Sequence, residues 1–302
     1  MRSERRLGVA LAGLTLALLG ACASPPGVPL PSDPRVASLP QAETIRDVPF
    51  FAQTDYYCGP AALAMTLVWS GLDVRQDDLV PIVYTPGRQG TLQTDILAGA
   101  RRFGRLAVPV DTLPDMLEEL AAGHPVLVLQ NLGLELLPQW HYAVVTGYDI
   151  DQRTLLLHSG LTADLEMSLD TFAWTWARGD NWALVILPPE LLPATADERA
   201  VVEAAAALER AGEHAAAEIA YGTILTRWPT SLPAWIGLGN AAYAAGDPAR
   251  AAAAFRHATA THPTSTAAWQ NLAFVLAELG EAEQAAVATE RAMSLGSALL
   301  GN

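Results

Sequence analysis

The chain has 302 residues, 51% of them hydrophobic, and its formal net charge at pH 7 is −14. This composition is typical of a globular protein and excludes a disordered or collagen-like chain. The length is enough for about two domains of ordinary size. Nucleic-acid-binding proteins normally carry a basic surface, so the excess of 32 acidic over 18 basic residues argues against a nucleic-acid partner.

The first segment, residues 1–21, has the pattern of an export signal. Its basic start is followed by the apolar run Leu7–Leu19, which is shorter than the roughly 20 residues of a membrane-spanning helix. The run ends in Leu19-Gly20-Ala21-Cys22, which resembles the bacterial lipobox. The resemblance implies lipidation of Cys22 and a place in the bacterial cell envelope, at the outer membrane facing the periplasm. The alternative is an ordinary signal peptide followed by a chance cysteine. The proline-rich residues 22–43 are predicted to form a tether.

Cys58 is the thiol that remains once Cys22 is acylated. Exported proteins usually pair their structural cysteines, so an unpaired thiol is either an apolar filler or a reactive group. Pro60 and the strong helix formers of Ala61–Trp69 place Cys58 at the N-terminus of a buried helix. The positive end of the helix dipole is expected to lower the thiol pKa. Gln53 lies five residues earlier, where its amide can donate into an oxyanion hole beside the Cys58 backbone N–H.

A thiolate nucleophile also needs a group that shuttles protons. The catalytic region has three histidines, His124, His141 and His158. His141 opens a pattern typical of a strand, and a base at the start of a strand that faces a helix N-terminus is the papain arrangement. We therefore predict that His141 is the base. His158 is predicted to be an ordinary strand residue, and His124, at a helix-to-strand junction, to be structural.

The two motifs are Gln-x4-Cys-Gly-Pro-Ala-Ala-Leu, starting at Gln53, and His-Tyr-Ala-Val-Val-x-Gly-Tyr, starting at His141. Together they resemble the papain-like cysteine peptidases of the bacteriocin-processing type, which cleave leader peptides after a Gly-Gly pair. The resemblance covers residues 44–189 and implies an α+β fold and a peptide or protein substrate. It implies Cys58 as nucleophile, His141 as general base and acid, and Gln53 as oxyanion donor. We expect neither a metal nor a cofactor.

One position departs from the pattern of this family. Its members usually carry an Asp, followed by Pro, at the end of the strand after the histidine, whereas this chain reads Leu157-His158-Ser159-Gly160. Ser159 and Asn181 are the candidates for the third catalytic position. Because neither side chain is charged, either one would weaken the ion pair and raise the Cys58 pKa relative to a full triad.

The remaining patterns of the first domain fit a small α+β fold. They predict helices at 91–103, 113–122 and 168–177, and strands at 126–130, 155–158 and 182–187. The loop Pro86–Gly90 is either a rim of the cleft or a simple turn, and we favour the simple turn. Trp174, Trp176 and Trp182 are predicted to lie in the core rather than to form a platform for substrate.

Residues 190–196 are predicted to link this domain to an all-α domain over residues 197–302. The second domain repeats with a period of 34 residues, as the pair Trp235 and Trp269 illustrates. It resembles the tetratricopeptide repeat (TPR), and three repeats are the usual minimum for stability. The resemblance implies a concave face that binds a peptide or a partner protein. The alternative is an inert helical cap.

Two functions therefore follow from the sequence. The first is a lipid-anchored cysteine peptidase whose repeats recruit a protein partner. Its cleavage sites would include those after small residues such as Gly-Gly. The second is a catalytically weak or inactive peptidase-like domain that acts as a peptide-binding scaffold lipoprotein, and the missing Asp motivates it. The sequence has no Walker A motif, so we do not expect the chain to use ATP itself.

Overall fold

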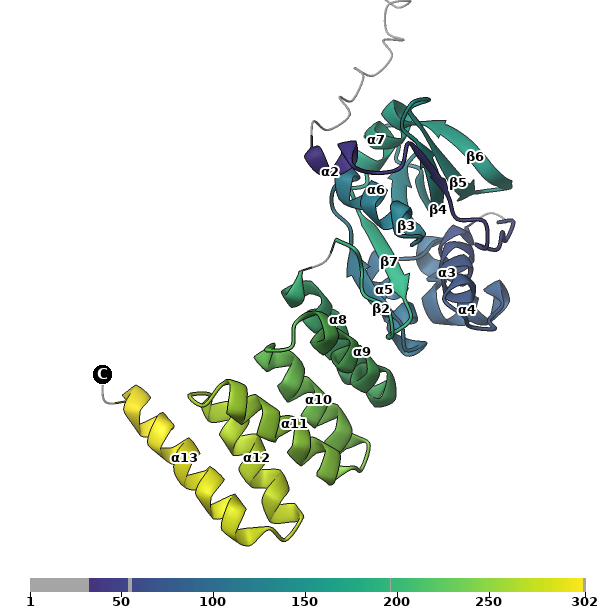
Figure 1. The fold of residues 1–302 in the computed structure, drawn as a ribbon. Helices are drawn as coiled ribbons and strands as arrows, with labels where there is room; N and C mark the ends of the chain where they lie inside the picture. The colour runs from purple at the N-terminus through teal and green to yellow at the C-terminus, as the bar shows by residue number, and fades with distance from the viewer. Residues whose placement is uncertain (1–32, 54–55, 196, 301–302) are drawn as a thin grey trace, which may run out of the picture.

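The computed structural model describes residues 33–53, 56–195 and 197–300. The predicted export signal over residues 1–21, the predicted lipidation site Cys22 and the first part of the predicted tether lie outside the described residues. The described chain forms an α+β domain followed by a row of helix pairs (Figure 1). This architecture confirms the predicted fold class.

A seven-stranded sheet lies at the centre of the first domain, in the order β2-β7-β3-β4-β5-β6, with β1 also paired to β4. Each of these pairings is antiparallel. The strands are β1 (Ala42–Thr44), β2 (Leu106–Pro109), β3 (Val126–Asn131), β4 (Trp140–Asp149), β5 (Thr154–Ser159), β6 (Thr162–Ser168) and β7 (Ala183–Leu187). Strand β7 is buried along its whole length, which explains its continuous apolar sequence.

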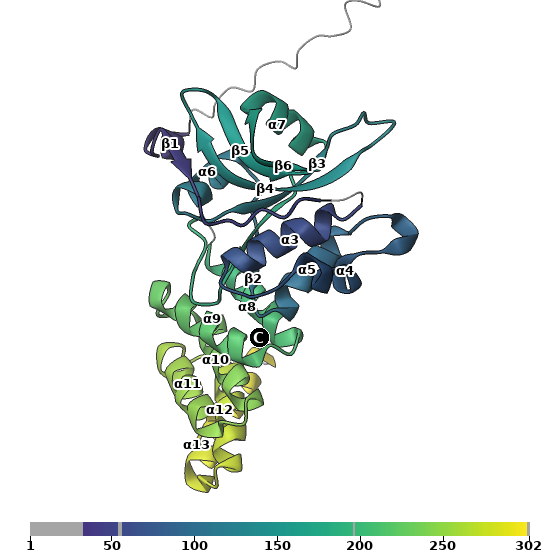
Figure 2. The ribbon, with the colours of Figure 1, turned by 90° about the vertical axis from the view of Figure 1, so that its right-hand side faces the viewer.

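Helices cover the sheet on both sides, and Figure 2 shows α3 and α7 on opposite sides of it. The helices are α2 (Pro34–Ala37), α3 (Cys58–Trp69), α4 (Gln76–Val83), α5 (Gln93–Arg102), α6 (Leu113–Ala121) and α7 (Leu169–Ala177), with a 3-10 turn η1 (Pro86–Arg88) between α4 and α5. Helix α3 packs against β3 and β4, and its residues 59–67 are all buried. A helix that is apolar on every side needs such a position.

The helices and strands that the sequence patterns predicted are all present, with bounds that differ by a few residues at most. Helix α4 and strands β2 and β6 were not predicted. Helix α4 contains Pro81, and a proline usually ends a helical pattern. Strand β6 lies at the edge of the sheet and is mostly polar and exposed, so it lacks the apolar alternation that marks a half-buried strand.

The second half of the predicted tether over residues 22–43 is packed against the domain, and the prediction is wrong for this part. Helix α2 buries Val36, and Arg35 donates a hydrogen bond of 2.8 Å to the carboxylate of Asp115. Strand β1 then pairs with β4. Pro34, which in the sequence suggests an extended linker, is the first residue of this short helix, because proline fits the first turn of a helix.

Six helices follow the sheet and stack as antiparallel pairs (Figure 1). They are α8 (Glu198–Arg210), α9 (His214–Arg227), α10 (Leu232–Ala244), α11 (Pro248–Thr261), α12 (Thr266–Glu278) and α13 (Ala282–Leu300). Within the described ranges, no helix is both long enough and apolar enough to span a membrane.

The period of 34 residues extends to the ends of these helices. Asp197, Ser231 and Ser265 each accept a hydrogen bond from the backbone N–H three residues later, and so cap the first helix of each pair. The same helices are followed by glycines with φ of +84°, +83° and +76°, at Gly212, Gly246 and Gly280. Glycine adopts this left-handed conformation without steric cost, so the turn between the paired helices is the same in each repeat.

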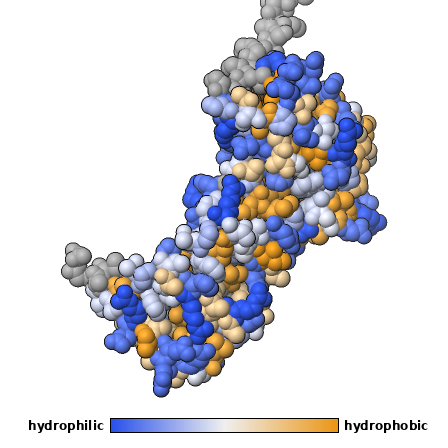
Figure 3. Space-filling model, in the orientation of Figure 1, coloured by the Kyte–Doolittle hydropathy of each residue, from blue (hydrophilic) through white to orange (hydrophobic). Residues whose placement is uncertain are grey.

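The first helix pair continues the core of the sheet domain. Helix α8 packs against β2, and its buried Val201 and Leu208 belong to the same hydrophobic cluster as the residues of the sheet. Figure 3 shows apolar surface gathered beside this junction. The first repeat is therefore part of the packing of the first domain.

A buried carboxylate holds the segment between the two domains. Glu119 of α6 is 0% exposed and accepts hydrogen bonds from the Thr195 backbone N–H (2.8 Å), the Thr195 hydroxyl (2.6 Å) and the Ala194 N–H (3.1 Å). Nδ1 of His124 lies 2.7 Å from the same carboxylate. Burial by itself raises the pKa of Glu119, but the hydrogen bonds from His124 and Thr195 outweigh it and hold the pKa below its ordinary value. His124 therefore lies in a structural position, as predicted.

We predict that Glu119→Ala lowers the free energy of unfolding by about 3 kcal/mol, because it leaves several buried donors without an acceptor. The control is Glu118→Ala, which removes a partly exposed carboxylate of the same helix, and we expect it to cost less than about 1 kcal/mol. Urea unfolding followed by tryptophan fluorescence measures both changes. Equal stability of the two variants would contradict the importance of this contact.

Candidate active site

A cavity of about 840 Å³ lies between the N-terminus of α3 and the start of β4. Gln53, Cys58 and His141 line it together, although 88 residues of sequence separate the first from the last. The β3–β4 hairpin and the loop between α4 and α5 extend from this side of the domain (Figure 2). Arg88, Gln89 and Gly90 line the cavity, so the turn Pro86–Gly90 is also a rim of the cleft.

Cys58 is the first residue of α3 and is partly buried. Close packing around the first turn of α3 produces this burial. A Cβ atom on Gly59 would lie 2.4 Å from Cβ of Thr91, so only glycine permits this approach. On the other side of the contact, the Tyr142 hydroxyl donates a hydrogen bond of 3.3 Å to the Thr91 carbonyl. Thr91 therefore joins the helical part of the domain to β4 next to the thiol.

Burial raises the pKa of the Cys58 thiol above its ordinary value. The backbone N–H groups of Tyr142, Gly59 and Cys58 itself favour the thiolate, but they offset only part of this effect. The backbone N–H groups at the helix N-terminus thus act in the predicted direction. The predicted net lowering of the thiol pKa is wrong for the free site, because the loss of water from around the sulfur is the larger effect.

His141 is the second residue of β4, where it opposes Gln130 of β3. Its Nε2 lies 3.0 Å from Oγ of Ser159, at the end of β5. In the tautomer that carries hydrogen on Nε2, Nε2–H donates a hydrogen bond to this oxygen. Nδ1 is then the basic nitrogen of the ring. Burial lowers the pKa of His141. The neutral imidazole and the neutral thiol are therefore the favoured forms in the free site.

The structure separates the two candidates for the third catalytic position. Ser159 is buried and contacts the His141 ring directly. Asn181 is exposed in the turn between α7 and β7, where its backbone N–H donates to the Trp176 carbonyl. The hydroxyl of Ser159 can fix the orientation of the ring, but it brings no charge that would stabilise an imidazolium.

Gln53 is 6% exposed, and its backbone N–H donates a hydrogen bond of 3.0 Å to the Gly160 carbonyl. Among the described residues, neither the amide nitrogen nor the amide oxygen of its side chain has a hydrogen-bond partner. A buried amide without a partner is costly and is unusual outside sites that bind a ligand. The amide thus lines the cavity with a free donor close to Cys58 in the sequence.

The other residues that the sequence singled out lie away from the reacting groups. The Nε2 atom of His158 is 3.2 Å from the Val48 carbonyl, and its ring packs against Phe50, as expected of a buried strand residue. Trp176 is buried, as predicted. The core prediction is wrong for Trp174, which is exposed and stacks on the guanidinium of Arg178 at 3.8 Å.

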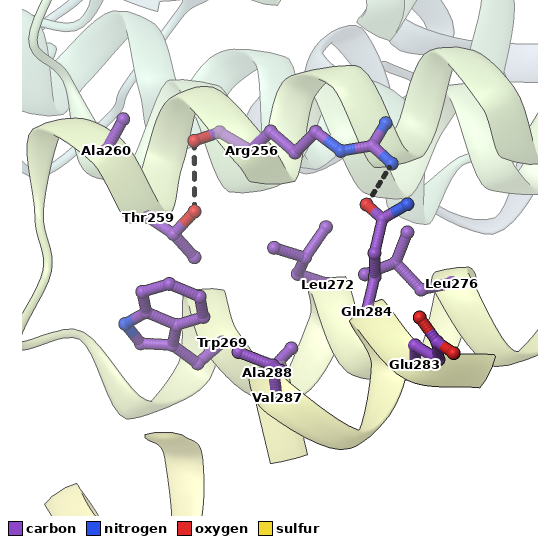
Figure 4. Close-up of a pocket in the computed structure, with 10 residues that line it drawn as sticks. All are labelled: Arg256, Thr259, Ala260, Trp269, Leu272, Leu276, Glu283, Gln284, Val287 and Ala288. Carbon is purple, nitrogen blue, oxygen red and sulfur yellow. Dashed lines mark hydrogen bonds between the residues drawn. The ribbon is translucent and has the colours of Figure 1, made fainter. Parts of the chain in front are cut away.

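A second cavity of about 540 Å³ lies among α11, α12 and α13 (Figure 4). Trp269 and Leu272 form part of its wall, and the Arg256 guanidinium donates to the side-chain oxygen of Gln284 across it. None of the described residues that line it is a cysteine or a histidine. Elsewhere in the described ranges, no group of three or more His, Cys, Asp or Glu side chains could hold a metal ion.

The sequence analysis did not identify Tyr142, Thr91 or the apolar residues Trp140 and Leu161 as parts of the cleft. Tyr142 acts on the thiol through its backbone N–H, which every residue except proline possesses, so its residue type carries no signal. The position of Thr91 depends on the contact with Gly59, which is a tertiary contact.

Residues 45–178 match the model of the Peptidase_C39 like family, and residues 232–275 match that of the tetratricopeptide repeat. The chain therefore carries a Peptidase_C39 like domain and a tetratricopeptide repeat, which confirms both resemblances. The comparison with curated proteins gives no match.

Among solved structures, the chain is similar to one described as a C39-like peptidase of Bacillus anthracis, with 18% identity and a TM-score of 0.42 over 49% of this chain and 98% of that one. It is also similar to the Sgt2 TPR domain of Aspergillus fumigatus, with 20% identity and a TM-score of 0.33 over 34% of this chain and 68% of that one. A third is the Yersinia enterocolitica type III secretion translocator chaperone SycD, with 16% identity and a TM-score of 0.31 over 32% and 74%.

We predict that the alkylation rate of Cys58 by iodoacetamide rises steadily from about pH 6 to about pH 9, because the thiolate reacts and the thiol pKa is raised. In Ser159→Asp, a carboxylate beside Nε2 raises the His141 pKa and stabilises the imidazolium. The rise should then begin at a lower pH. Ser159→Ala is the control and should not move the profile toward acid. An alkylation rate that is already constant near pH 6 in the unaltered protein would contradict a neutral Cys58 thiol and a neutral His141 imidazole in the free site.

Proposed function

We propose that this chain, which carries a Peptidase_C39 like domain over residues 45–178, is a lipid-anchored cysteine peptidase. The observation that supports the proposal most is the shared cavity of Gln53, Cys58 and His141. A thiol, a neutral imidazole and a free amide donor in one cleft are the groups that hydrolysis of an amide through a thioester needs.

In the proposed reaction, Sγ of Cys58 attacks the carbonyl carbon of the peptide bond while Nδ1 of His141 takes the thiol proton. The carbonyl oxygen gains negative charge and accepts hydrogen bonds from the Gln53 amide and the Cys58 backbone N–H. His141 then gives its proton to the leaving amine. Water, deprotonated by His141, hydrolyses the thioester and restores the thiol.

Ser159 orients the imidazole in this mechanism through its contact with Nε2. Its oxygen accepts a hydrogen bond from Nε2–H, which leaves Nδ1 as the ring nitrogen that exchanges the proton. Because the hydroxyl is neutral, the imidazolium that forms during the reaction is stabilised less than it would be beside a carboxylate. We therefore expect a slower enzyme than one with a complete triad.

We further propose that lipidation of Cys22 anchors the protein to the bacterial cell envelope, at the outer membrane facing the periplasm, and that the repeats bind a protein partner. The lipobox pattern that ends at Cys22 supports the anchor. The match of residues 232–275 to the tetratricopeptide repeat supports the partner, because stacked helix pairs generally present an extended binding surface. Cleavage after small residues such as Gly-Gly is part of the proposal.

The second candidate function is a peptide-binding protein that does not cut its ligand. The raised pKa of Cys58 and the uncharged partner of His141 favour it, because both lower the concentration of the reactive thiolate. In that case the cleft would bind peptides with or without the thiol.

The experiment measures hydrolysis of a pool of internally quenched Gly-Gly peptides by the full-length protein. We predict that Cys58→Ala abolishes cleavage and that Gln53→Ala lowers kcat by about 100-fold, the usual cost of one oxyanion donor. The matched control is Gln139→Ala, which removes an exposed amide that lines the same cavity and should leave kcat within about threefold.

Two results would contradict the enzyme. One is the absence of cleavage by a folded protein that binds the peptides. The other is cleavage that persists at the same rate in Cys58→Ala, which would assign it to a contaminating peptidase.

A further inference from the structure

Exposed apolar side chains gather on the hairpin that joins β3 to β4. Leu136 is 93% exposed and Leu137 75% exposed, and Leu134 is also exposed. Single exposed leucines are common in soluble proteins, but a cluster of them usually marks a surface that contacts something else.

The base of this hairpin is held by a dedicated set of polar contacts. Oδ1 of Asn131 accepts hydrogen bonds from the backbone N–H groups of Gly133 (3.0 Å) and Gln139 (2.9 Å). From the other side, the Arg178 guanidinium donates to the carbonyls of Asn131 (2.7 Å) and Gly133 (2.5 Å). The same guanidinium stacks on the exposed ring of Trp174. The apolar tip is thus presented on a preorganised support, which reduces the entropy lost on binding.

The apolar surface continues into the cleft. Trp140 follows the hairpin and precedes His141, and Leu161 lies two residues after Ser159. Both side chains are exposed, and both line the cavity that holds Cys58. The rim formed by the turn at Arg88 is polar, so the leucines extend one wall of the cleft only.

We propose that this apolar surface, defined as Leu134, Leu136, Leu137 and Trp140 of the β3–β4 hairpin and Leu161 of the β5–β6 turn, binds an apolar segment of the polypeptide whose peptide bond lies at Cys58. The inference rests on the proposed function, because the cleft gives the occupant its position. Since an extended chain advances about 3.3 to 3.6 Å per residue, a peptide that leaves the cleft along this wall reaches the leucines within a few residues.

The charges favour a peptide over a lipid surface as the occupant. The stretch 132–140 contains one acidic residue, Glu135, and no basic residue, and the whole chain has a net charge of −14. Proteins that bind anionic bilayers surround their apolar residues with Lys or Arg. The continuity with the cleft, in contrast, places these leucines where a bound peptide passes.

The test measures binding in the full-length Cys58→Ala protein, so that it does not depend on turnover. Two fluorescent peptides share a Gly-Gly centre, which is flanked on both sides by leucines in one and by serines in the other. We expect the leucine peptide to bind about tenfold more tightly, a modest part of what burial of three leucines can contribute. The combined variant Leu134→Gln, Leu136→Gln and Leu137→Gln should abolish this preference.

The matched control is Val287→Gln with Met293→Gln, which changes apolar side chains of α13 that are 65% and 67% exposed, and it should keep the preference. All these side chains are on the surface, so thermal melting should be unchanged in both variants.

The proposal is overturned if the triple leucine variant keeps the preference for the leucine peptide, or if the protein with the unaltered hairpin shows no preference. It is also overturned if the leucine variant instead loses binding to phosphatidylcholine vesicles with no change for either peptide. Failure of the peptidase proposal is recognised separately, by the absence of hydrolysis in the protein that retains Cys58.

Discussion

The contact between the first turn of α3 and the start of β4 determines the rest of the site. Gly59 allows Thr91 to approach the helix, and the Tyr142 hydroxyl ties Thr91 to the sheet. This packing removes the Cys58 sulfur from water and brings backbone N–H groups to it. The two effects oppose each other, and burial is the stronger one. The site therefore holds a neutral thiol and a neutral imidazole in one cavity, and in the proposed reaction a proton moves between them.

The same domain is joined closely to the helix pairs that follow it. Glu119 holds the connecting segment through Ala194 and Thr195, and α8 extends the core beyond β2. The first repeat and the sheet that carries the cleft consequently share one hydrophobic core. The β3–β4 hairpin extends the opposite, open end of the cleft, and its polar base at Asn131 and Arg178 keeps the tip in place.

Sequence patterns predicted the two-part fold, the helix that begins at Cys58 and the strand that carries His141 near its start. They succeeded because local rules decide these features: proline in a first helical turn, apolar runs and a regular period of 34 residues. Ser159 was one of two candidates, and only the strand pairing of β4 with β5 places it beside the imidazole. The raised thiol pKa could not be predicted, because burial of one sulfur atom depends on tertiary contacts. The helix that contains Pro81 was missed because tertiary packing overrides its local preference.

In the reaction that we propose, Cys58 forms a covalent acyl intermediate in this cleft. Rapid acid quenching during hydrolysis of an activated glycyl ester, followed by proteolytic digestion and mass spectrometry, measures this intermediate directly. We expect an acyl group bound through a thioester to the fragment that contains Cys58, and less of it in Gln53→Ala. A folded protein that hydrolyses the ester with no acyl group on Cys58, or that binds peptides and never becomes acylated, would contradict this mechanism.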